Sequence, residues 1–183
     1  MPGVAHFPMM RAMPGNISSP LERLDPITVI GWREWVSLPD LGIATTKAKI
    51  DTGARSSSLH AIDQRLSRRD GVDWVSFEVH PLQRRDDFAI ACEAPVHDRR
   101  RVRSSSGAAQ WRYVVRTRLH WMGLDFDVDL TLADRTVMGF RMLIGREAIR
   151  GHLLVDPGRS YFGPRPSRSL RHPPASSPPP LPS

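Results

Sequence analysis

An acidic residue stands at the end of a strand-like segment in the first third of the chain. Ala48 and Ile50 alternate with lysines, which is the period-two pattern of a strand with one buried face, and this segment continues directly into Asp51. Gly53 permits a tight turn with positive φ, and the Thr52 hydroxyl can hold neighbouring backbone. The pattern predicts one carboxylate presented on a rigid turn. Taken alone, Asp-Thr-Gly is also compatible with an ordinary structural turn.

The elements that must position this turn are predicted to be short strands separated by turn residues. The alternation is strongest in residues 110–132, where two such runs flank Met122-Gly123 and form a hairpin with one acidic face. The sum is an all-β closed barrel with one short helix. We expect strands at 27–38 with a kink, 43–50, 57–62, 72–79, 87–94, 110–121, 125–132, 140–144 and 152–155, a charged loop at 65–71, and a helical turn at 146–150.

Proline divides the chain into three parts, because most of its 17 prolines lie near the two ends. The apolar content of 40% is typical of a globular protein. We therefore expect a folded domain at residues 27–163, a disordered N-terminal extension at 1–26 and a disordered Pro/Ser/Arg-rich tail at 164–183. No run has the length of a membrane span or of a signal-peptide core, so the sequence predicts a cytoplasmic protein with no membrane partner.

Charge and cysteine content exclude several classes of protein. The formal net charge of +7 is modest and partly carried by the flanking segments, and no RNA-binding or helix-turn-helix signature accompanies it. A solvated surface is the default interpretation, and nucleic acid is not the expected partner. Cys92 is the only cysteine, so neither an internal disulfide nor a thiolate zinc cluster can form within one chain. We expect Cys92 to be a small buried residue.

Two segments carry a resemblance to a known family. Asp51-Thr52-Gly53-Ala54 resembles the catalytic turn of the retropepsin-like aspartic proteases, and Leu143-Ile144-Gly145-Arg146 resembles the apolar segment that braces this turn. The surrounding sequence is similar to the bacterial retropepsin-like family labelled "ATP-dependent zinc protease", which is associated with ATP-grasp glutamate ligases. The shared segments follow one order through about three quarters of the chain: 49–55, 59–61, 102–107, 134–138, 143–146 and 154–157.

The resemblance implies an aspartic-type peptidase or amidohydrolase acting on peptide or glutamyl amide bonds. Such catalysis needs two adjacent carboxylates that share one proton, because two like charges that close cannot both be ionised. The chain has one Asp-Thr-Gly, so we expect a homodimer in which each subunit contributes Asp51. Thr52 would brace the turn across the interface, and Leu143, Ile144 and Gly145 would pack beneath it.

Arginines near the turn are candidates for substrate recognition. In retropepsins, the arginine matching Arg146 pairs with an acid shortly after the catalytic turn, but Arg55 stands there in this chain. We expect Ala54 and Arg55, with Arg103 as a second arginine, to bind substrate, the arginines receiving carboxylates of a peptide or oligo-glutamate chain. The alternative is that Arg55 pairs with an internal acid such as Asp134.

The basic segment before residue 108 occupies the place of the retropepsin flap, which closes over substrate. Its Ser and Gly residues give mobility and its arginines attract anions, although the usual glycine-rich tip is missing. A solvated surface loop is the alternative interpretation. The residues of this segment expected to contact substrate are Arg103, Ser104, Ser105, Ser106 and Gly107.

The zinc and ATP labels find no matching motif in this sequence. There is no His-Glu-x-x-His, and the histidines lack short ligand spacing, so we expect no metal and no cofactor. His60 is expected to have a structural or hydrogen-bonding role. No Gly-rich phosphate loop is present, so any ATP dependence would act through a partner, such as an ATP-grasp glutamate ligase. Two alternative functions remain: a non-catalytic binding module for glutamylated tails or a ligase, and a zinc-dependent hydrolase.

Overall fold

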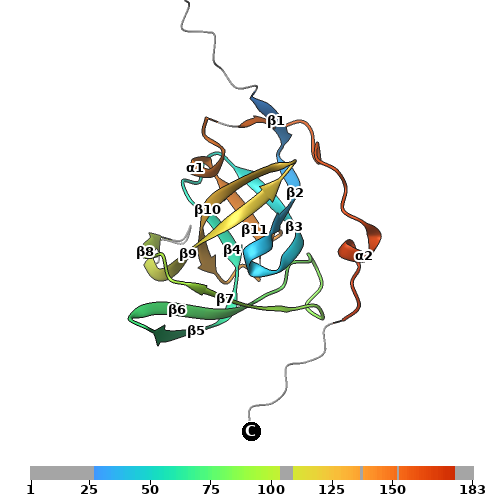
Figure 1. Cartoon of the computed structure of the whole chain (residues 1–183). Coiled ribbons are helices and arrows are strands. Elements are labelled where there is room, and N and C mark those ends of the chain that lie inside the picture. Colours follow the sequence, from blue (N-terminus) through green and yellow to red (C-terminus); the bar gives the residue numbers. More distant parts are fainter. Residues whose placement is uncertain (1–26, 104–108, 137, 152, 176–183) are drawn as a thin grey trace, which may run out of the picture.

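The computed structural model describes residues 27–103, 109–136, 138–151 and 153–175. Within these residues the chain is built mostly of strands with few and short helices, as the alternating sequence predicts (Figure 1). The elements are β1 (Thr28–Gly31), β2 (Arg33–Leu38), the 3₁₀ helix η1 (Pro39–Leu41), β3 (Ile43–Asp51), β4 (Ser57–His60), β5 (Ile62–Arg69), β6 (Val72–Val79), β7 (Ile90–Pro95), β8 (Asp98–Arg103), β9 (Ala109–Trp121), β10 (Leu124–Ala133), β11 (Met142–Gly145), α1 (Arg146–Ile149), β12 (Leu153–Asp156) and α2 (Arg168–Arg171).

Six strands close into a barrel in the order β10, β4, β11, β3, β2, β9, and β9 pairs again with β10 (Figure 1). β8 extends this sheet beyond β9, so that β8 and β9 form an antiparallel hairpin. β11 lies between β3 and β4, parallel to the first and antiparallel to the second. The predicted all-β barrel, with a short helix after the second apolar segment, is confirmed.

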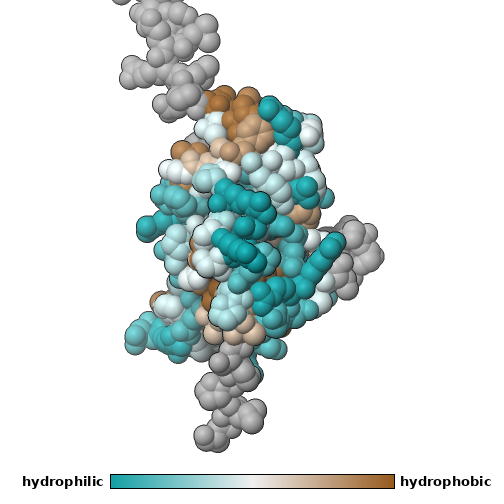
Figure 2. Space-filling model, turned by 90° about the vertical axis from the view of Figure 1, so that its right-hand side faces the viewer, coloured by the Kyte–Doolittle hydropathy of each residue, from teal (hydrophilic) through white to brown (hydrophobic). Residues whose placement is uncertain are grey.

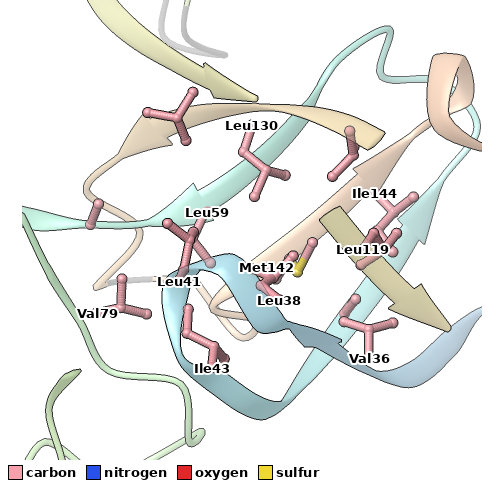
Figure 3. Packing of buried hydrophobic residues seen from close by; sticks show 14 of the residues in the cluster. Val36, Leu38, Leu41, Ile43, Leu59, Val79, Leu119, Leu130, Met142 and Ile144 are labelled. Carbon is pink, nitrogen blue, oxygen red and sulfur yellow. The ribbon is translucent and has the colours of Figure 1, made fainter. Parts of the chain in front are cut away.

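The barrel is closed around aliphatic side chains that each strand directs inward at every second position. Figure 3 shows these side chains pointing toward one another, and burial of each contributes about 1.5–3 kcal/mol. Thr46 is a polar exception whose hydroxyl donates to the Pro81 carbonyl at 2.8 Å. The central contributors are Val36 from β2, Ile43 from β3, Leu59 from β4, Leu119 from β9, Leu130 from β10 and Ile144 from β11.

A separate three-stranded sheet of β5, β6 and β7 lies below the barrel in Figure 1. The predicted charged loop at 65–71 is wrong, because β5 continues to Arg69 and pairs with β6 across a turn at Asp70 and Gly71. Both turn residues have positive φ, of 48° and 80°, which is the geometry of a tight hairpin. The sequence of β5 does not indicate a strand, because most of its side chains are exposed and it therefore lacks alternating apolar residues.

The C-terminal part of the described chain returns along the outside of the barrel. Buried Glu34 accepts hydrogen bonds from the backbone N–H groups of Gly31 (2.7 Å), Phe162 (2.9 Å) and Gly163 (3.4 Å), which ties this segment to β2. Tyr161 N also donates to the Arg33 carbonyl at 3.0 Å. The segment then passes α2, which contacts β3. Residues 164–175 of the Pro/Ser/Arg-rich segment thus lie against the barrel.

Candidate active site

Asp51 is the last residue of β3, and its side chain is held by the turn that follows. Its Oδ1 accepts hydrogen bonds from the backbone N–H groups of Gly53 at 3.0 Å and Ala54 at 3.1 Å. The Ala54 N–H also approaches the Asp51 carbonyl at 3.2 Å, which closes the turn. Thr52 and Gly53 are exposed, and Asp51 is half-buried. The turn therefore fixes one carboxylate oxygen with backbone donors and presents the carboxyl at the protein surface.

Gly145 lies directly opposite Asp51 in the parallel pairing of β11 with β3, and buried Ile144 lies opposite Ile50. The N–H of Gly145 donates to the Ser57 hydroxyl at 3.1 Å. A Cβ on Gly145 would lie 2.6 Å from the carbonyl carbon of Ser56, so only glycine allows this close approach of two backbones. We call this place, where β11 lies between β3 and β4 and Gly145 packs against Ser56, the Gly145 crossing. It fixes the base of the Asp51 turn.

The short helix α1 fastens the turn from its other side. The backbone N–H of Arg146 donates to the Ala54 carbonyl at 2.9 Å, and that of Glu147 donates to the Arg55 carbonyl at 3.2 Å. The Arg146 guanidinium donates to the Gly53 carbonyl at 3.1 Å. Arg146 thus supports the turn through hydrogen bonds from its backbone N–H and its guanidinium to backbone carbonyls, rather than by pairing with an acid.

Arg55 lies 3.7 Å from Glu147, with the two side chains 78% and 43% exposed. The alternative that Arg55 pairs with an internal acid is therefore met, but by Glu147: Asp134, the example considered above, accepts from Thr136 and lies near His60 instead. In the pairing that the resemblance implies, the acid follows the turn and the arginine follows the glycine of the second segment. Here the arginine, Arg55, follows the turn, and the acid, Glu147, lies in α1. An exposed pair of this kind adds little stability, which leaves Arg55 able to bind another carboxylate.

A cleft of about 540 Å³ opens beside the turn. Arg55, Ser56 and Ser57 border it on one side, and the β8–β10 strands border it on the other. Arg100 and Arg116 reach into it, but both donate to Asp129, at 2.9 Å each. The arginines of the cleft are matched by the acids that line it, Asp127, Asp129 and Glu147. The cleft is therefore polar and mixed in charge.

Arg135 is a buried arginine near the turn, and no local sequence pattern indicates a role for it. Its Nη1 donates to the Ser58 hydroxyl at 2.9 Å, and its Nε donates to the Phe140 carbonyl at 3.2 Å. Burial, followed by repulsion from Arg112, lowers the pKa of Arg135, while the charge of Asp51 acts in the opposite direction. An arginine so placed keeps its proton and puts a fixed positive charge near the Asp51 carboxyl.

His60 has the hydrogen-bonding role that the sequence favours. It is 1% exposed, and its Nδ1 accepts the backbone N–H of Arg135 at 2.9 Å. Burial, followed by the charge of Arg141, lowers the pKa of His60. The imidazole is therefore neutral at pH 7 and orders the loop that carries Arg135. Among the described residues, no three His, Cys, Asp or Glu side chains gather in a way that could hold a metal ion.

The hairpin of β8 and β9 occupies the chain position expected for a flap. Asp98 to Arg103 form β8, with Arg103 paired to Ala109, so this part of the basic segment is a strand. Arg99 pairs with Asp73 at 2.9 Å, and Trp111 is 72% exposed on the neighbouring strand. The predicted contact residues Ser104, Ser105, Ser106 and Gly107 lie outside the described residues. Exposed Trp111 is a further candidate for substrate contact, recognisable in the sequence as an aromatic residue beside the hairpin tip.

Comparison with protein families gives a match through most of the chain. The family model described as "RimB-like: Retropepsin-like aspartic endopeptidase RimB" matches residues 29–166. The chain belongs to this family. The match begins within β1 and ends after the segment anchored by Glu34, so it contains the whole barrel, the Asp51 turn and the Gly145 crossing. The retropepsin-like identity expected from the two motifs is confirmed.

Similar proteins include parts of longer chains. A protein named "Probable alpha-L-glutamate ligase" from Desulfotalea psychrophila is 47% identical over 129 residues, which are 70% of this chain and 28% of that protein. One of the same name from Shewanella pealeana is 45% identical over 133 residues, 73% of this chain and 29% of that protein. This RimB-like chain thus spans less than a third of these relatives.

A solved structure has the same architecture. A Legionella pneumophila protein of unknown function is 25% identical, with a TM-score of 0.59 over 74% of this chain and 97% of that one. In the RimB-like chain, no described helix has the length and apolar character needed to cross a bilayer.

Proposed function

We propose that this protein is a homodimeric aspartic-type hydrolase that cleaves peptide or glutamyl amide bonds. The observation that carries the proposal is the Asp51 carboxyl, held by two backbone N–H groups on a turn that the Gly145 crossing and α1 fasten from below. A carboxylate so fixed is oriented before substrate arrives, which lowers the cost of reaching the reactive geometry.

The chemistry follows from bringing two such turns together. Two Asp51 side chains across a two-fold axis share one proton, because the second charge is disfavoured beside the first. The ionised carboxyl takes a proton from water, which attacks the amide carbonyl, while the protonated carboxyl donates to the carbonyl oxygen. Collapse of the resulting tetrahedral species then expels the amine: the carboxyl that took the proton from water gives it to the nitrogen, and a hydroxyl of the tetrahedral carbon returns its proton to the other carboxylate. Arg135 supplies a fixed positive charge near this centre.

A surface suited to the dimer lies at the end of the barrel that carries α1. β1 and β12 form a two-stranded parallel sheet there (Figure 1). Val29 and Leu154 are paired on this sheet and are 41% and 56% exposed, and neighbouring Ile27 is 44% exposed. Figure 2 shows a hydrophobic patch at the same end of the molecule. Exposed apolar side chains that gather in this way favour a protein contact. Since α1, which holds the Asp51 turn, lies at this end, we propose the two-fold axis of the dimer here.

The substrate side of the proposal rests on the cleft and on the relatives. Arg55 is the arginine of the cleft that is least committed to an acid, and it stands four residues from Asp51. A guanidinium in this position suits a substrate carboxylate. Because relatives are named as glutamate ligases, we propose that the substrate carries glutamate and that a ligase of this kind is a partner. We place the protein in the cytoplasm, where such a ligase would find ATP.

Mass spectrometry of a glutamate-extended peptide tests the proposal. The peptide is incubated with the wild-type protein and with Asp51→Asn, each with and without a metal chelator. Asp63→Asn is the matched control, because Asp63 is exposed on β5, away from the turn. We expect cleavage by the wild-type protein and the control, loss of cleavage in Asp51→Asn, and no effect of the chelator.

Other outcomes contradict this assignment in different ways. Cleavage that persists in Asp51→Asn overturns the aspartic mechanism. Cleavage abolished by chelator in the wild-type protein favours a zinc hydrolase. A peptide that binds without being cut, and whose binding survives Asp51→Asn but weakens in Arg55→Gln, favours a non-catalytic binding module.

A further inference from the structure

A second hollow lies on the side of the barrel, away from the Asp51 turn. It has a volume of about 440 Å³ and is bounded by Trp35 of β2, Lys47 of β3, the 81–85 loop and the C-terminal segment. None of its lining residues lines the cleft beside the turn. Figure 2 faces the side of the molecule that carries α2, and strongly hydrophilic side chains gather across the middle of that face.

The lining of this groove is basic and contains no acid. Its charged members are Lys47, Arg84, Arg85, Arg165 and Arg171. Among the residues that the structure describes, only Arg85 of these five has a carboxylate partner, Asp87 at 2.6 Å. The cations converge from three separate parts of the chain, the strand β3, the loop before β7 and the segment around α2. Such a concentration of like charge is costly unless an anion occupies it.

Lys47 lies at the centre of this concentration. Its pKa is lowered by burial first and then by the charges of Arg33, Arg165, Arg171 and Arg84. All four arginines are therefore close enough to oppose protonation of one lysine. An anion in the groove would relieve this repulsion for every member at once.

Aromatic rings form the inner support of the groove. Trp35 and Tyr161 stack with ring centroids 6.0 Å apart. The Lys47 ammonium lies 4.9 Å from the Trp35 centroid, and the Arg33 guanidinium lies 5.1 Å from that of Tyr161. Cation–π contacts position these cations without neutralising them. Because these rings already contact each other and the cations, their faces are less open to stacking with a nucleotide base. The groove is therefore better suited to binding the charge of phosphate groups.

The backbone has an unusual conformation at Arg84, which lines the groove, and at Tyr161, whose ring stacks on Trp35 of the lining. Arg84 and Tyr161 have φ of 61° and 60°, in the left-handed region that non-glycine residues seldom adopt. Such conformations persist only where the surrounding structure holds them, and outliers of this kind gather at ligand sites. Tyr161 is fixed by its N–H bond to the Arg33 carbonyl, and Arg85 Nη1 donates to the Pro173 carbonyl at 2.9 Å. The groove is thus a formed site whose two walls are tied together.

We propose that this groove binds a compact phosphate ligand of several negative charges, either an inorganic polyphosphate or the phosphate chain of a nucleotide. Lysine and arginine are the ordinary ligands of phosphate oxygens. A hollow of this size suits a small molecule rather than a duplex. The cations line one hollow, and four arginines act on the single amine of Lys47. A di- or triphosphate concentrates several charges in such a space, whereas a polycarboxylate chain spreads them.

Isothermal titration calorimetry with tripolyphosphate and with ATP tests this proposal at low and moderate salt. The test variant is Arg84→Gln/Arg165→Gln, because both side chains are exposed and neither makes a hydrogen bond or ion pair with another described residue. The matched control is Arg65→Gln/Arg118→Gln, which removes the same charge from exposed positions outside the groove. We expect saturable binding that weakens at least about tenfold in the groove variant, is unchanged in the control, and falls with salt.

Equal affinities for the two ligands identify the phosphate chain as the recognised group, and a tighter ATP complex adds contact with the nucleoside. Asp51→Asn binds as the wild-type protein does, which separates this site from the proposed catalysis. The proposal is overturned if neither ligand binds with saturation, if the groove and control variants weaken alike, or if hexaglutamate binds more tightly than tripolyphosphate.

Discussion

Replacement of Gly145 by alanine tests whether the strand crossing beneath Asp51 is as tight as the structure has it. The new Cβ would lie 2.6 Å from the Ser56 carbonyl carbon, 2.7 Å from its oxygen and 2.8 Å from the Arg55 carbonyl oxygen. All three are backbone atoms, so no side chain can rotate away. Overpacking of a core costs about 1–3 kcal/mol, and the rigid contact here places Gly145→Ala near about 3 kcal/mol.

Urea denaturation measures this effect. With an m-value of about 2 kcal/mol per molar, the midpoint should fall by about 1.5 M. Gly139→Ala is the matched control, because a Cβ there meets nothing within 4 Å, and its free energy of unfolding should change by less than about 0.5 kcal/mol. Since the clash moves the residues that follow Asp51, Gly145→Ala should also lose peptide cleavage. Equal midpoints for the two variants would refute the crossing as described.

Two further predictions concern buried titratable groups. Because the folded pKa of His60 is lowered, the unfolded chain binds its proton first, so the free energy of unfolding should fall as pH decreases from about 6.5 toward 5. Thermal melts of the wild-type protein and of two variants measure this effect. The loss of stability between about pH 6.5 and pH 5 should be smaller in His60→Gln than in the wild-type protein, and should match the wild-type loss in His120→Gln, whose histidine is exposed. The same pH profile for all three proteins would contradict the assignment to His60. Burial raises the pKa of the Cys92 thiol to about 12, so the folded protein should react with an aromatic disulfide reagent at pH 8 only after denaturation. Rapid reaction of the native protein would contradict this placement.

The barrel could be predicted because most of its strands have one buried face. β9 and β10 alternate between apolar and polar residues over their length, and the expected ranges 110–121 and 125–132 match the strands to within one residue at each end. β5 could not be found in this way, since its exposed side chains carry no periodic signal. The Asp70-Gly71 turn was the available signal, because this dipeptide favours a tight hairpin.

The site could be predicted only where neighbours in sequence decide it. The Asp51 turn depends on residues 51–54 alone, so its form follows from local chemistry. The contact of Arg55 with Glu147 depends on β11 lying between β3 and β4. No local sequence pattern predicts this order of strands. Arg135 is likewise buried by its contact with Ser58, 77 residues away in sequence. Long-range partners of this kind need the fold before they can be named.

Subunit mixing tests most directly whether Asp51 acts as a pair across a dimer. Wild-type protein and Asp51→Asn are mixed at equal amounts, allowed to exchange subunits, and assayed for peptide cleavage at fixed total concentration. If each active centre needs one Asp51 from each chain, only dimers of two wild-type subunits are active, and activity falls to about a quarter of the all-wild-type value. An activity of about one half would show that each chain acts alone and would contradict the shared dyad.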